Sequence, residues 1–279
     1  MILKDFEPSD KLRHIVKNYV LLHFEFDRYK PVPVKPFPVR PVQSLVFYLK
    51  GGVRCFDPET GQFKTFPKMA INGAQTKRFD FHVEPQQFML SVDFQHGGLS
   101  KFLQMPLKEE FLNERIDAEA LLNPDIGRVY EQMQHATSYQ QIIDLVEDYL
   151  WQKIQKQRML INLLERVSLL LSHQSRVPSV EYLADQACLS LGQFERRFKR
   201  QMGISPKFFL RAQRFNQAFM LKEQNPSLDW LSIALQTGYN DYQHMAKDFK
   251  QFAGTTPNSL LQAQANAPER ILGLVEFWV

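Results

Sequence analysis

The sequence predicts an α+β N-terminal domain, a small β-barrel or sandwich with flanking helices, followed by an all-α domain in which a long helix joins two helix-turn-helix units. Short runs of aromatic and β-branched residues, separated by turn residues, fill roughly residues 1–100. From Leu99 onward the apolar pattern becomes helical, and one segment recurs about fifty residues later. We therefore expect two domains, covering residues 1–157 and 158–279.

The N-terminal strands are predicted from local composition. Residues 31–41, PVPVKPFPVRP, contain too much proline for a regular element and are expected to form an extended connector. The expected strands are Ser44–Leu49, Phe63–Phe66, Phe79–Val83 and Phe88–Phe94, with turns at Gly51-Gly52, Asp57-Pro58, Thr60-Gly61 and Asn72-Gly73. Five aromatic residues are expected either to be plain core or to line a pocket: Phe47, Phe79, Phe81, Phe88 and Phe94.

Two amphipathic helices are expected after the strands. Apolar residues recur at three- and four-residue spacing over Gln141–Ile154, so this helix is predicted either to cover a sheet or to form a dimer interface. A second helix is expected over Met159–Leu171. The remainder of the chain contains helical patterns and no convincing strand.

Composition limits the class of protein. Hydrophobic residues make up 44% of the chain and charged residues 23%, which is typical of a globular protein. The net charge of +4 by itself says nothing about nucleic acid. Cys55 and Cys188 lie far apart, so neither a disulfide framework nor structural zinc is expected. Because no signal peptide or membrane-spanning apolar run is visible, we expect a cytoplasmic protein without membrane contact.

Sequence motifs of enzymes are absent. The seven histidines show no HxH or HExxH spacing, and the chain contains no GxSxG, P-loop or dinucleotide motif. His82 and Glu84 in FHVEP could supply two ligands of a metal site, but no third ligand presents itself. We therefore expect no enzyme, no catalytic residue, no metal and no cofactor.

An internal repeat is the strongest feature of the sequence. The matching segments are Leu183-Ala184 with Ile233-Ala234, Cys188-Leu189-Ser190 with Gly238-Tyr239-Asn240, Phe198 with Phe249, and Gly203–Pro206 with Gly254–Pro257. The offset grows from fifty to fifty-one residues, which one inserted residue at the start of the later helix explains. A repeat of this kind predicts two copies of one structural unit.

Each copy is predicted to be a helix, a tight turn and a second helix. In the first copy, Ser179 and Ser190 are expected N-caps, because their hydroxyl oxygens can accept otherwise unpaired backbone N–H groups. Phe194 and Phe198 lie one turn apart on the expected buried face, and Gly203 is expected to end the second helix.

The second helix of the first copy carries a local basic excess. Residues 176–214 contain eight basic and three acidic residues. These charges are either merely solvated or form a face that enters the major groove of DNA, as the second helix of a helix-turn-helix does. The presence of two copies favours DNA binding.

The two copies are predicted to be joined by one stiff helix. Ser205 is an expected N-cap, Pro206 suits the first helical position, and Asn225-Pro226 ends the helix after Gln224. Nineteen residues at about 1.5 Å each span about 28 Å. Successive major-groove faces repeat every ~34 Å, so one chain could read two adjacent groove segments.

These segments resemble the AraC/XylS family of transcription regulators from about Met159 to Gln262. The resemblance is carried by LADQACLSLGQFERRFKRQMGISPKFFLRAQR and by IALQTGYNDYQHMAKDFKQFAGTTP. It implies sequence-specific binding of double-stranded DNA, with recognition helices at about Leu191–Met202 and Asp241–Phe252. The N-terminal domain resembles the sensor and dimerisation half of such regulators. A small-molecule effector, a homodimer and, if the protein is an activator, RNA polymerase are therefore also expected as partners, and no effector-binding residue is predicted.

The resemblance also implies DNA-contacting residues. The expected base-reading residues are Gly192, Glu195, Arg196, Tyr242, Gln243, Ala246 and Lys247. The expected backbone contacts are Ser190, Gln193, Lys199, Arg200, Asn240 and Lys250. Arg196 has the geometry to address a guanine and Gln243 an adenine.

An alternative is a helix-turn-helix interaction protein that has lost specific DNA binding and acts through protein partners. Gly192 offers no side chain to a base, while Glu195 and Asp248 are acidic residues on the recognition helices. Glu195 is expected to pair with Lys199 at i+4, and His244 is expected to pack.

Two further features of the sequence each have two possible interpretations. Arg214 is expected either to contact phosphate or to tie domains together. The apolar tail, ERILGLVEFWV, is expected to fold back as packing or to form an interface.

Overall fold

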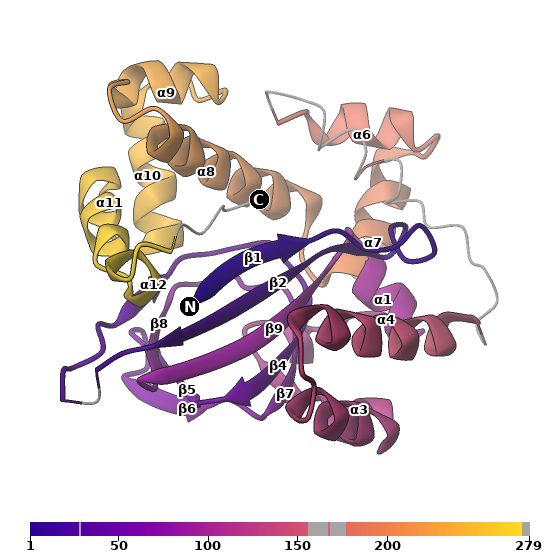
Figure 1. Cartoon of the computed structure of the whole chain (residues 1–279). Helices are drawn as coiled ribbons and strands as arrows, with labels where there is room; N and C mark the ends of the chain where they lie inside the picture. Colours follow the sequence, from indigo (N-terminus) through magenta and orange to yellow (C-terminus); the bar gives the residue numbers. More distant parts are fainter. Residues whose placement is uncertain (28, 156–166, 168–176, 275–279) are drawn as a thin grey trace.

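A computed structural model describes residues 1–27, 29–155, 167 and 177–274 of the chain (Figure 1). The expected domain boundary between residues 157 and 158 lies outside the described residues, as do the last five residues of the apolar tail. The expected helix at Met159–Leu171 is also outside them, apart from the buried Val167.

The N-terminal domain consists of two open antiparallel sheets. The six-stranded sheet has the order β1-β2-β9-β4-β7-β10 and the four-stranded sheet the order β3-β8-β5-β6. The strands are β1 Ile2–Phe6, β2 Val16–Glu25, β3 Lys35–Phe37, β4 Ser44–Lys50, β5 Val53–Asp57, β6 Gln62–Thr65, β7 Met69–Asn72, β8 Phe79–Val83, β9 Gln86–Phe94 and β10 Arg115–Asp117. The domain is therefore a sandwich rather than a closed barrel.

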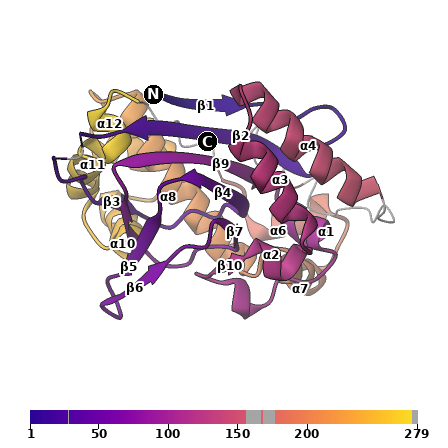
Figure 2. The same ribbon diagram turned by 60° about the horizontal axis from the view of Figure 1, so that its bottom comes forward.

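Helices cover the outer face of the six-stranded sheet (Figure 2). They are α1 Gly98–Leu103, α2 Ala118–Leu122, α3 Asp125–Gln134 and α4 Tyr139–Gln155, with a short 3-10 turn, η1, at Glu109–Phe111. In α4, Ile142, Val146 and Leu150 are buried in one core with Leu21 and Leu90 of the sheet. The prediction that this helix covers a sheet is confirmed.

The sequence prediction missed several strands. Strand β2 reads VKNYVLLHFE, with apolar residues on both faces, because one face meets the helices and the other faces the second sheet. Strand β3 lies inside the expected proline-rich connector, so that expectation was too broad. Pro36 is tolerated there because β3 is an edge strand, where an amide N–H is dispensable.

The C-terminal domain contains seven described helices. They are α6 Val180–Gln186, α7 Leu191–Met202, α8 Pro206–Gln224, α9 Trp230–Gln236, α10 Tyr242–Ala253, α11 Pro257–Ala265 and α12 Pro268–Ile271. Ser179, Ser190 and Ser205 cap α6, α7 and α8 as predicted, through backbone N–H groups at 3.1, 3.4 and 3.2 Å. Gly203 ends α7 with φ of 77°, a left-handed conformation that suits glycine.

Two phenylalanine-rich cores hold these helices together. Phe194 and Phe198 of α7 pack with Phe209 of α8 in the first helix-turn-helix unit. In the second unit, Phe215 of α8 packs against Phe249 of α10, with ring centroids 4.7 Å apart. Because α8 contributes to both cores, it fixes the two units relative to each other. The double helix-turn-helix architecture is confirmed.

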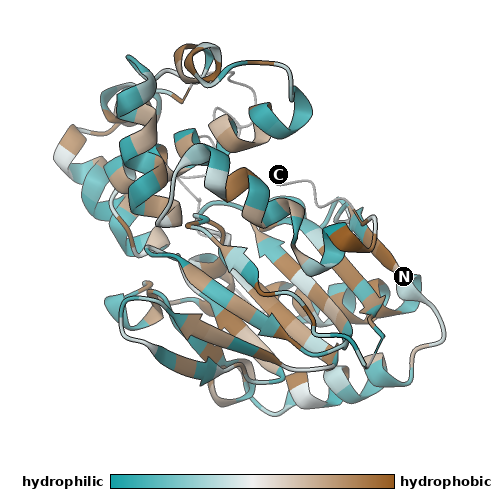
Figure 3. Cartoon of the chain, turned by 90° about the vertical axis from the view of Figure 1, so that its left-hand side faces the viewer, coloured by the Kyte–Doolittle hydropathy of each residue, from teal (hydrophilic) through white to brown (hydrophobic). Residues whose placement is uncertain are grey.

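The C-terminal helices pack directly against the N-terminal sheets (Figures 1 and 3). The segment between β3 and β4, residues 38–43, lies at the junction between the domains. From here on we use the name connector for these residues, and not for the proline-rich stretch 31–41. Val39 of the connector is fully buried in the core formed by α8, α10 and neighbouring helices. Lys35 of β3 forms an ion pair of 2.6 Å with the buried Glu269 of α12. The described start of the apolar tail therefore folds back as packing between the domains.

Candidate nucleic-acid interface

The first recognition helix, α7, begins at a capping box. The Ser190 hydroxyl oxygen accepts the backbone N–H of Gln193, and the Gln193 side-chain oxygen accepts the backbone N–H of Ser190 at 3.3 Å. This reciprocal pair fixes the entry of the helix. The expected DNA-contacting residues of α7 are all exposed: Gly192, Gln193, Glu195, Arg196, Lys199 and Arg200.

The second recognition helix, α10, begins one residue later than the repeat alone would place it. Asp241 is the N-cap and accepts the backbone N–H of His244 at 2.7 Å. Asn240 is the extra residue before this cap, which accounts for the change of offset from fifty to fifty-one. Within α10, Gln243, Lys247 and Lys250 are exposed, whereas the expected base readers Tyr242 and Ala246 are partly buried.

The structure thus brings the expected contact residues onto two equivalent faces. When α7 and α10 are aligned from their N-caps, Arg196 corresponds to Lys247 and Lys199 to Lys250. Each of these two recognition helices, which we also call reading heads, therefore carries two cations at the same helical positions. Gly192 corresponds to Gln243, so an amide is present in the second head where the first has no side chain.

Two expectations about charged residues on these helices need correction. Lys199 forms an ion pair of 3.5 Å with Glu109 of the N-terminal domain, not the expected pair with Glu195. Asp248 is 1% exposed and accepts from Arg211 and, at 3.2 Å, from the Tyr239 hydroxyl, so it belongs to the core and not to the recognition face. The interpretation of Asp248 as a charge facing DNA was wrong.

Arg214 and His244 have packing roles inside the second unit. The Arg214 guanidinium lies 5.2 Å from the centre of the Tyr239 ring. His244 makes an edge contact with the same ring, with centroids 5.1 Å apart, as expected for packing. Tyr239 therefore anchors α10 on α8 through contacts with a cation, an imidazole and the buried Asp248.

Both recognition helices end against the N-terminal domain. The Gln43 amide donates to the carbonyl of Met202, the last residue of α7, at 3.1 Å. The Val39 backbone N–H donates to the carbonyl of Phe252 in α10 at 2.9 Å. These hydrogen bonds satisfy carbonyls that a helix terminus leaves unpaired. No local sequence signal predicts them, because the partners lie more than 150 residues apart.

Two more contacts strengthen this junction. Arg78 donates to the carbonyl of Ala253, the last residue of α10, at 3.2 Å. The Leu107 backbone N–H donates to the carbonyl of Arg200 in α7 at 2.9 Å. A movement of the N-terminal domain would therefore act on the C-terminal ends of both recognition helices.

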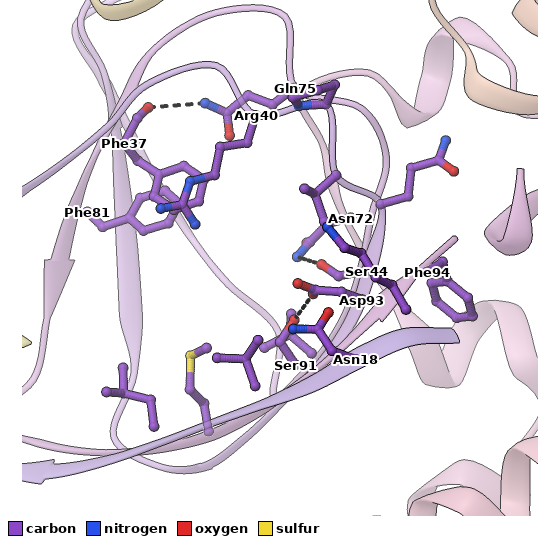
Figure 4. A pocket seen from close by; sticks show the side chains of 18 of the residues that line it. Asn18, Phe37, Arg40, Ser44, Asn72, Gln75, Phe81, Ser91, Asp93 and Phe94 are labelled. Carbon is purple, nitrogen blue, oxygen red and sulfur yellow. Dashed lines mark hydrogen bonds between the residues drawn. The ribbon is translucent and has the colours of Figure 1, made fainter. Parts of the chain in front are cut away.

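A cavity of about 520 Å³ lies between the two sheets and reaches the C-terminal helices (Figure 4). Phe37 and Phe81 of the smaller sheet stack at 4.3 Å, and the Arg40 guanidinium of the connector lies 4.9 Å from the Phe37 ring. The C-terminal domain contributes residues of α7, α8 and α12: Met202, Gln213, Asn216, Gln217, Met220, Pro268 and Glu269.

The five aromatic residues considered for a pocket have different positions. Phe81 and Phe94 line the cavity. Phe47 and Phe79 are buried in the cores on either side of the six-stranded sheet. Phe88 stacks on His23, with ring centroids 4.4 Å apart, and contacts Tyr139 at the start of α4.

His96 connects the cavity to α8. Its ring makes an edge contact with Phe209 at 4.9 Å, and the Gln213 amide nitrogen lies 3.5 Å from its Nε2 atom. Burial lowers the pKa of the His96 imidazole from 6.5 to about 4. The folded protein therefore keeps this ring neutral at a pH where the unfolded chain would protonate it.

This shift predicts acid sensitivity. Above pH 6.5 neither state binds the proton, and as the pH falls towards 4 the unfolded state gains it first, so stability is lost over that interval. Between about pH 7.5 and 5 we expect His96 to account for a loss of about 2 kcal/mol in the free energy of unfolding. Urea unfolding of wild-type protein and of His96→Gln at both pH values measures it. An equal loss in both proteins would contradict the assignment.

No metal site or membrane span is found in the part of the chain that the structure describes. Residues 1–27, 29–155, 167 and 177–274 contain no group of three or more metal-ligating side chains. His82 instead packs against Phe63, with ring centroids 5.1 Å apart. Among the same residues, no helix has the length and apolarity needed to cross a membrane.

Two helix-turn-helix units on one rigid helix, each with an exposed recognition helix, define the C-terminal half as a double helix-turn-helix domain. Residues 183–263 match a family described as "Helix-turn-helix domain". This region is an AraC-type helix-turn-helix domain. Residues 4–117 match a family described as a domain of unknown function (DUF6597).

Three proteins are similar to this chain in whole or in part. An uncharacterised HTH-type transcriptional regulator from Haemophilus influenzae is 38% identical over 80 residues, which is 28% of this chain and 26% of that protein. The match thus spans about a quarter of that relative's length. Unsaturated-fatty-acid-bound ToxT from Vibrio cholerae is 12% identical over 93% of this chain and 98% of its own, with a TM-score of 0.48. An AraC-type regulator from Chromobacterium violaceum is 26% identical over 37% of this chain and 91% of its own, with a TM-score of 0.33.

Proposed function

We propose that this protein is a sequence-specific DNA-binding transcription regulator whose recognition helices, α7 and α10, enter two adjacent segments of the major groove. The observation that supports this most strongly is α8, a continuous helix of 19 residues packed into the cores of both units. At about 1.5 Å per residue it spans about 28 Å, close to the ~34 Å repeat of the groove.

The exposed residues of the two heads supply complementary contacts. Arg196 and Gln243 are suited to read base edges, as are Glu195 and Lys247, while Tyr242 and Ala246 contribute apolar contact from partly buried positions. Backbone contacts are assigned to the residues at the helix starts and along the basic flank: Ser190, Gln193, Lys199, Arg200, Asn240 and Lys250. Gly192 leaves the first head with fewer side-chain contacts than the second.

One argument for the rival function, a helix-turn-helix interaction protein without specific DNA binding, does not hold. Asp248 is buried in an ion pair with Arg211, so α10 does not present this negative charge to a phosphate backbone. Selection of bound sequences from a random DNA library by the full chain separates the two functions. Enrichment of one motif supports regulation through DNA, and recovery of unselected sequences supports the rival.

Salt dependence provides a quantitative prediction. If five cations, Arg196, Lys199, Arg200, Lys247 and Lys250, approach phosphates or bases, about four to five counterions are released on binding. Affinity for the selected site should then fall about 10²–10³-fold between 50 and 200 mM salt. Fluorescence anisotropy over a salt series measures the slope, and a nearly flat dependence would contradict phosphate-anchored binding.

Control by an effector is the second part of the proposal. The cavity is lined by both domains, and the connector joins its wall to the ends of α7 and α10. A ligand that favours one arrangement of this junction would change the relative populations of DNA-binding states. Ligand-dependent change in DNA affinity of the full chain tests this part.

A further inference from the structure

The floor of the cavity contains a row of polar side chains that crosses four adjacent strands. Strand pairing places Asn18 of β2 opposite Asp93 of β9, Asp93 opposite Ser44 of β4, and Ser44 opposite Asn72 of β7. We call these four residues the polar row. All four line the cavity, and Figure 4 shows them gathered on one side of it. A sheet face that needed only to pack would carry apolar residues here.

The next positions along the same strands are mostly apolar. Two residues beyond the polar row, β2 and β4 present Val20 and Val46, and β2 then presents Leu22 beside Met89 of β9. Because side chains alternate between faces, these residues face the same cavity as the polar row. The cavity therefore has one polar end and an apolar continuation, a pattern suited to a molecule with a polar edge and an apolar body.

Several amide oxygens at the polar end have no hydrogen-bond partner. The Asn18 amide nitrogen donates to the Asp5 carboxylate. Because a carboxylate only accepts hydrogen bonds, Asp5 offers no donor to the Asn18 amide oxygen, which has no hydrogen-bond partner. The Gln43 amide nitrogen likewise donates to the Met202 carbonyl, and the Gln43 oxygen has no partner although the residue is only 2% exposed. Asn72 shows the same pattern, with its nitrogen donating to Ser44 at 3.0 Å. Such acceptors require hydrogen-bond donors.

The charges around the polar row favour an uncharged donor. Burial raises the pKa of the Asp93 carboxyl, while a hydrogen bond from Ser91 and the nearby cations Lys17 and Arg40 oppose this rise, so the row presents no unbalanced negative charge to a cation. The whole lining contains five Lys and Arg residues and three Asp and Glu residues, which disfavours a cationic ligand. An anionic group at the row would meet the oxygens of Asn18, Asn72 and Asp93. Hydroxyl groups, which donate and accept without charge, fit this surface best.

We propose that this cavity binds an uncharged, polyhydroxylated small molecule, with neighbouring hydroxyl groups against Asn18, Asp93, Ser44 and Asn72 and its less polar face toward Val20, Val46 and Met89. The connector transmits binding, because Arg40 and Gln43 line the cavity while Val39 is inserted into the DNA-binding domain. This transmission rests on the proposed function, whereas ligand binding itself does not.

The binding step is tested with the full chain and matched probes. Calorimetry is run with uncharged pentoses, hexoses, alditols and short alkyl glycosides, each beside its acid and amine analogue, for example glucose, gluconate and glucosamine. We expect at least one uncharged probe to bind with Kd below about 1 mM and its charged analogues to bind at least about tenfold more weakly. Absence of binding by every uncharged probe, or tighter binding of a charged analogue, would overturn the proposal.

Substitutions identify the polar row as the contact surface. Asn72→Leu and Asp93→Asn should each weaken binding of that probe at least about tenfold, and Ser44→Ala, which barely changes the packing, by about three- to tenfold. Gln62→Leu, the same kind of replacement on the exposed strand β6, is the matched control and should leave Kd unchanged. If the Ser44→Ala and Asp93→Asn proteins melt at the same temperature as wild type and bind the probe with the wild-type Kd, the probe binds at another surface.

Transmission is tested separately. Saturating probe should change the Kd for the selected DNA site by about fivefold or more in wild-type protein. Val39→Ala, which lies outside the cavity lining, should keep probe affinity but reduce this change to less than about twofold. Probe binding without any effect on DNA affinity in wild-type protein would overturn the transmission step. Absence of specific DNA binding in probe-free protein would instead refute the proposed function and leave the ligand site standing.

Discussion

Replacing Arg196 and Lys247 together by alanine is expected to abolish specific DNA binding. These residues occupy the same position in α7 and α10, both are exposed, and each belongs to the expected base-reading set. Loss of one such contact costs about 1–3 kcal/mol, so the double variant should bind its site at least about 30-fold more weakly. Arg196→Ala alone should relax the base preference at one position of the site.

The control for this experiment removes equal charge elsewhere. Arg128→Ala with Lys64→Ala deletes two exposed cations of the N-terminal domain, far in the chain from either head. Anisotropy titrations with the selected site and with a scrambled site separate specific from general electrostatic binding. If the double variant bound as tightly as wild type, α7 and α10 would not be the reading heads.

Replacing Asp248 by alanine is expected to destabilise the second helix-turn-helix unit. The carboxylate is almost fully buried, and its loss would leave the buried Tyr239 hydroxyl and the Arg211 guanidinium without their acceptor. Removing one member of a buried pair costs several kcal/mol, and because Arg211 is about one-third exposed we expect about 2–4 kcal/mol. DNA affinity should fall as a consequence of unfolding in the second head.

Chemical denaturation measures this effect directly. The free energy of unfolding of Asp248→Ala is compared with that of Glu195→Ala, which removes an exposed acid from the other recognition helix and should change it by less than about 0.5 kcal/mol. Equal midpoints for the two variants would show that Asp248 is not a structural residue.

The helical half of the molecule was predictable because its signals are local. The caps Ser179, Ser190 and Ser205 lie within three residues of the N–H groups they satisfy, and the spacing of Phe194 and Phe198 identifies a buried face within one turn. The bounds of α7 and α8 follow from these signals. The buried role of Asp248 did not, because its partner Arg211 is 37 residues away.

The N-terminal half was less predictable because both faces of its main sheet are covered. Strand β2 alternates between helices on one side and the cavity on the other, so the period-two pattern that identifies a half-exposed strand is blurred. The polar row likewise depends on the pairing register of four strands, which no single strand reveals. The contacts of the connector with α7 and α10 depend on the packing of two domains.

One chain of this protein is expected to read two successive major-groove segments. Methylation interference on the selected site tests it most directly, because methylation of guanine N7 blocks contacts in the major groove. We expect two clusters of interfering guanines on one face of the duplex, about 10 base pairs apart, with Arg196→Ala removing interference in one cluster and Lys247→Ala in the other. A single cluster, or no interference despite binding, would contradict the claim.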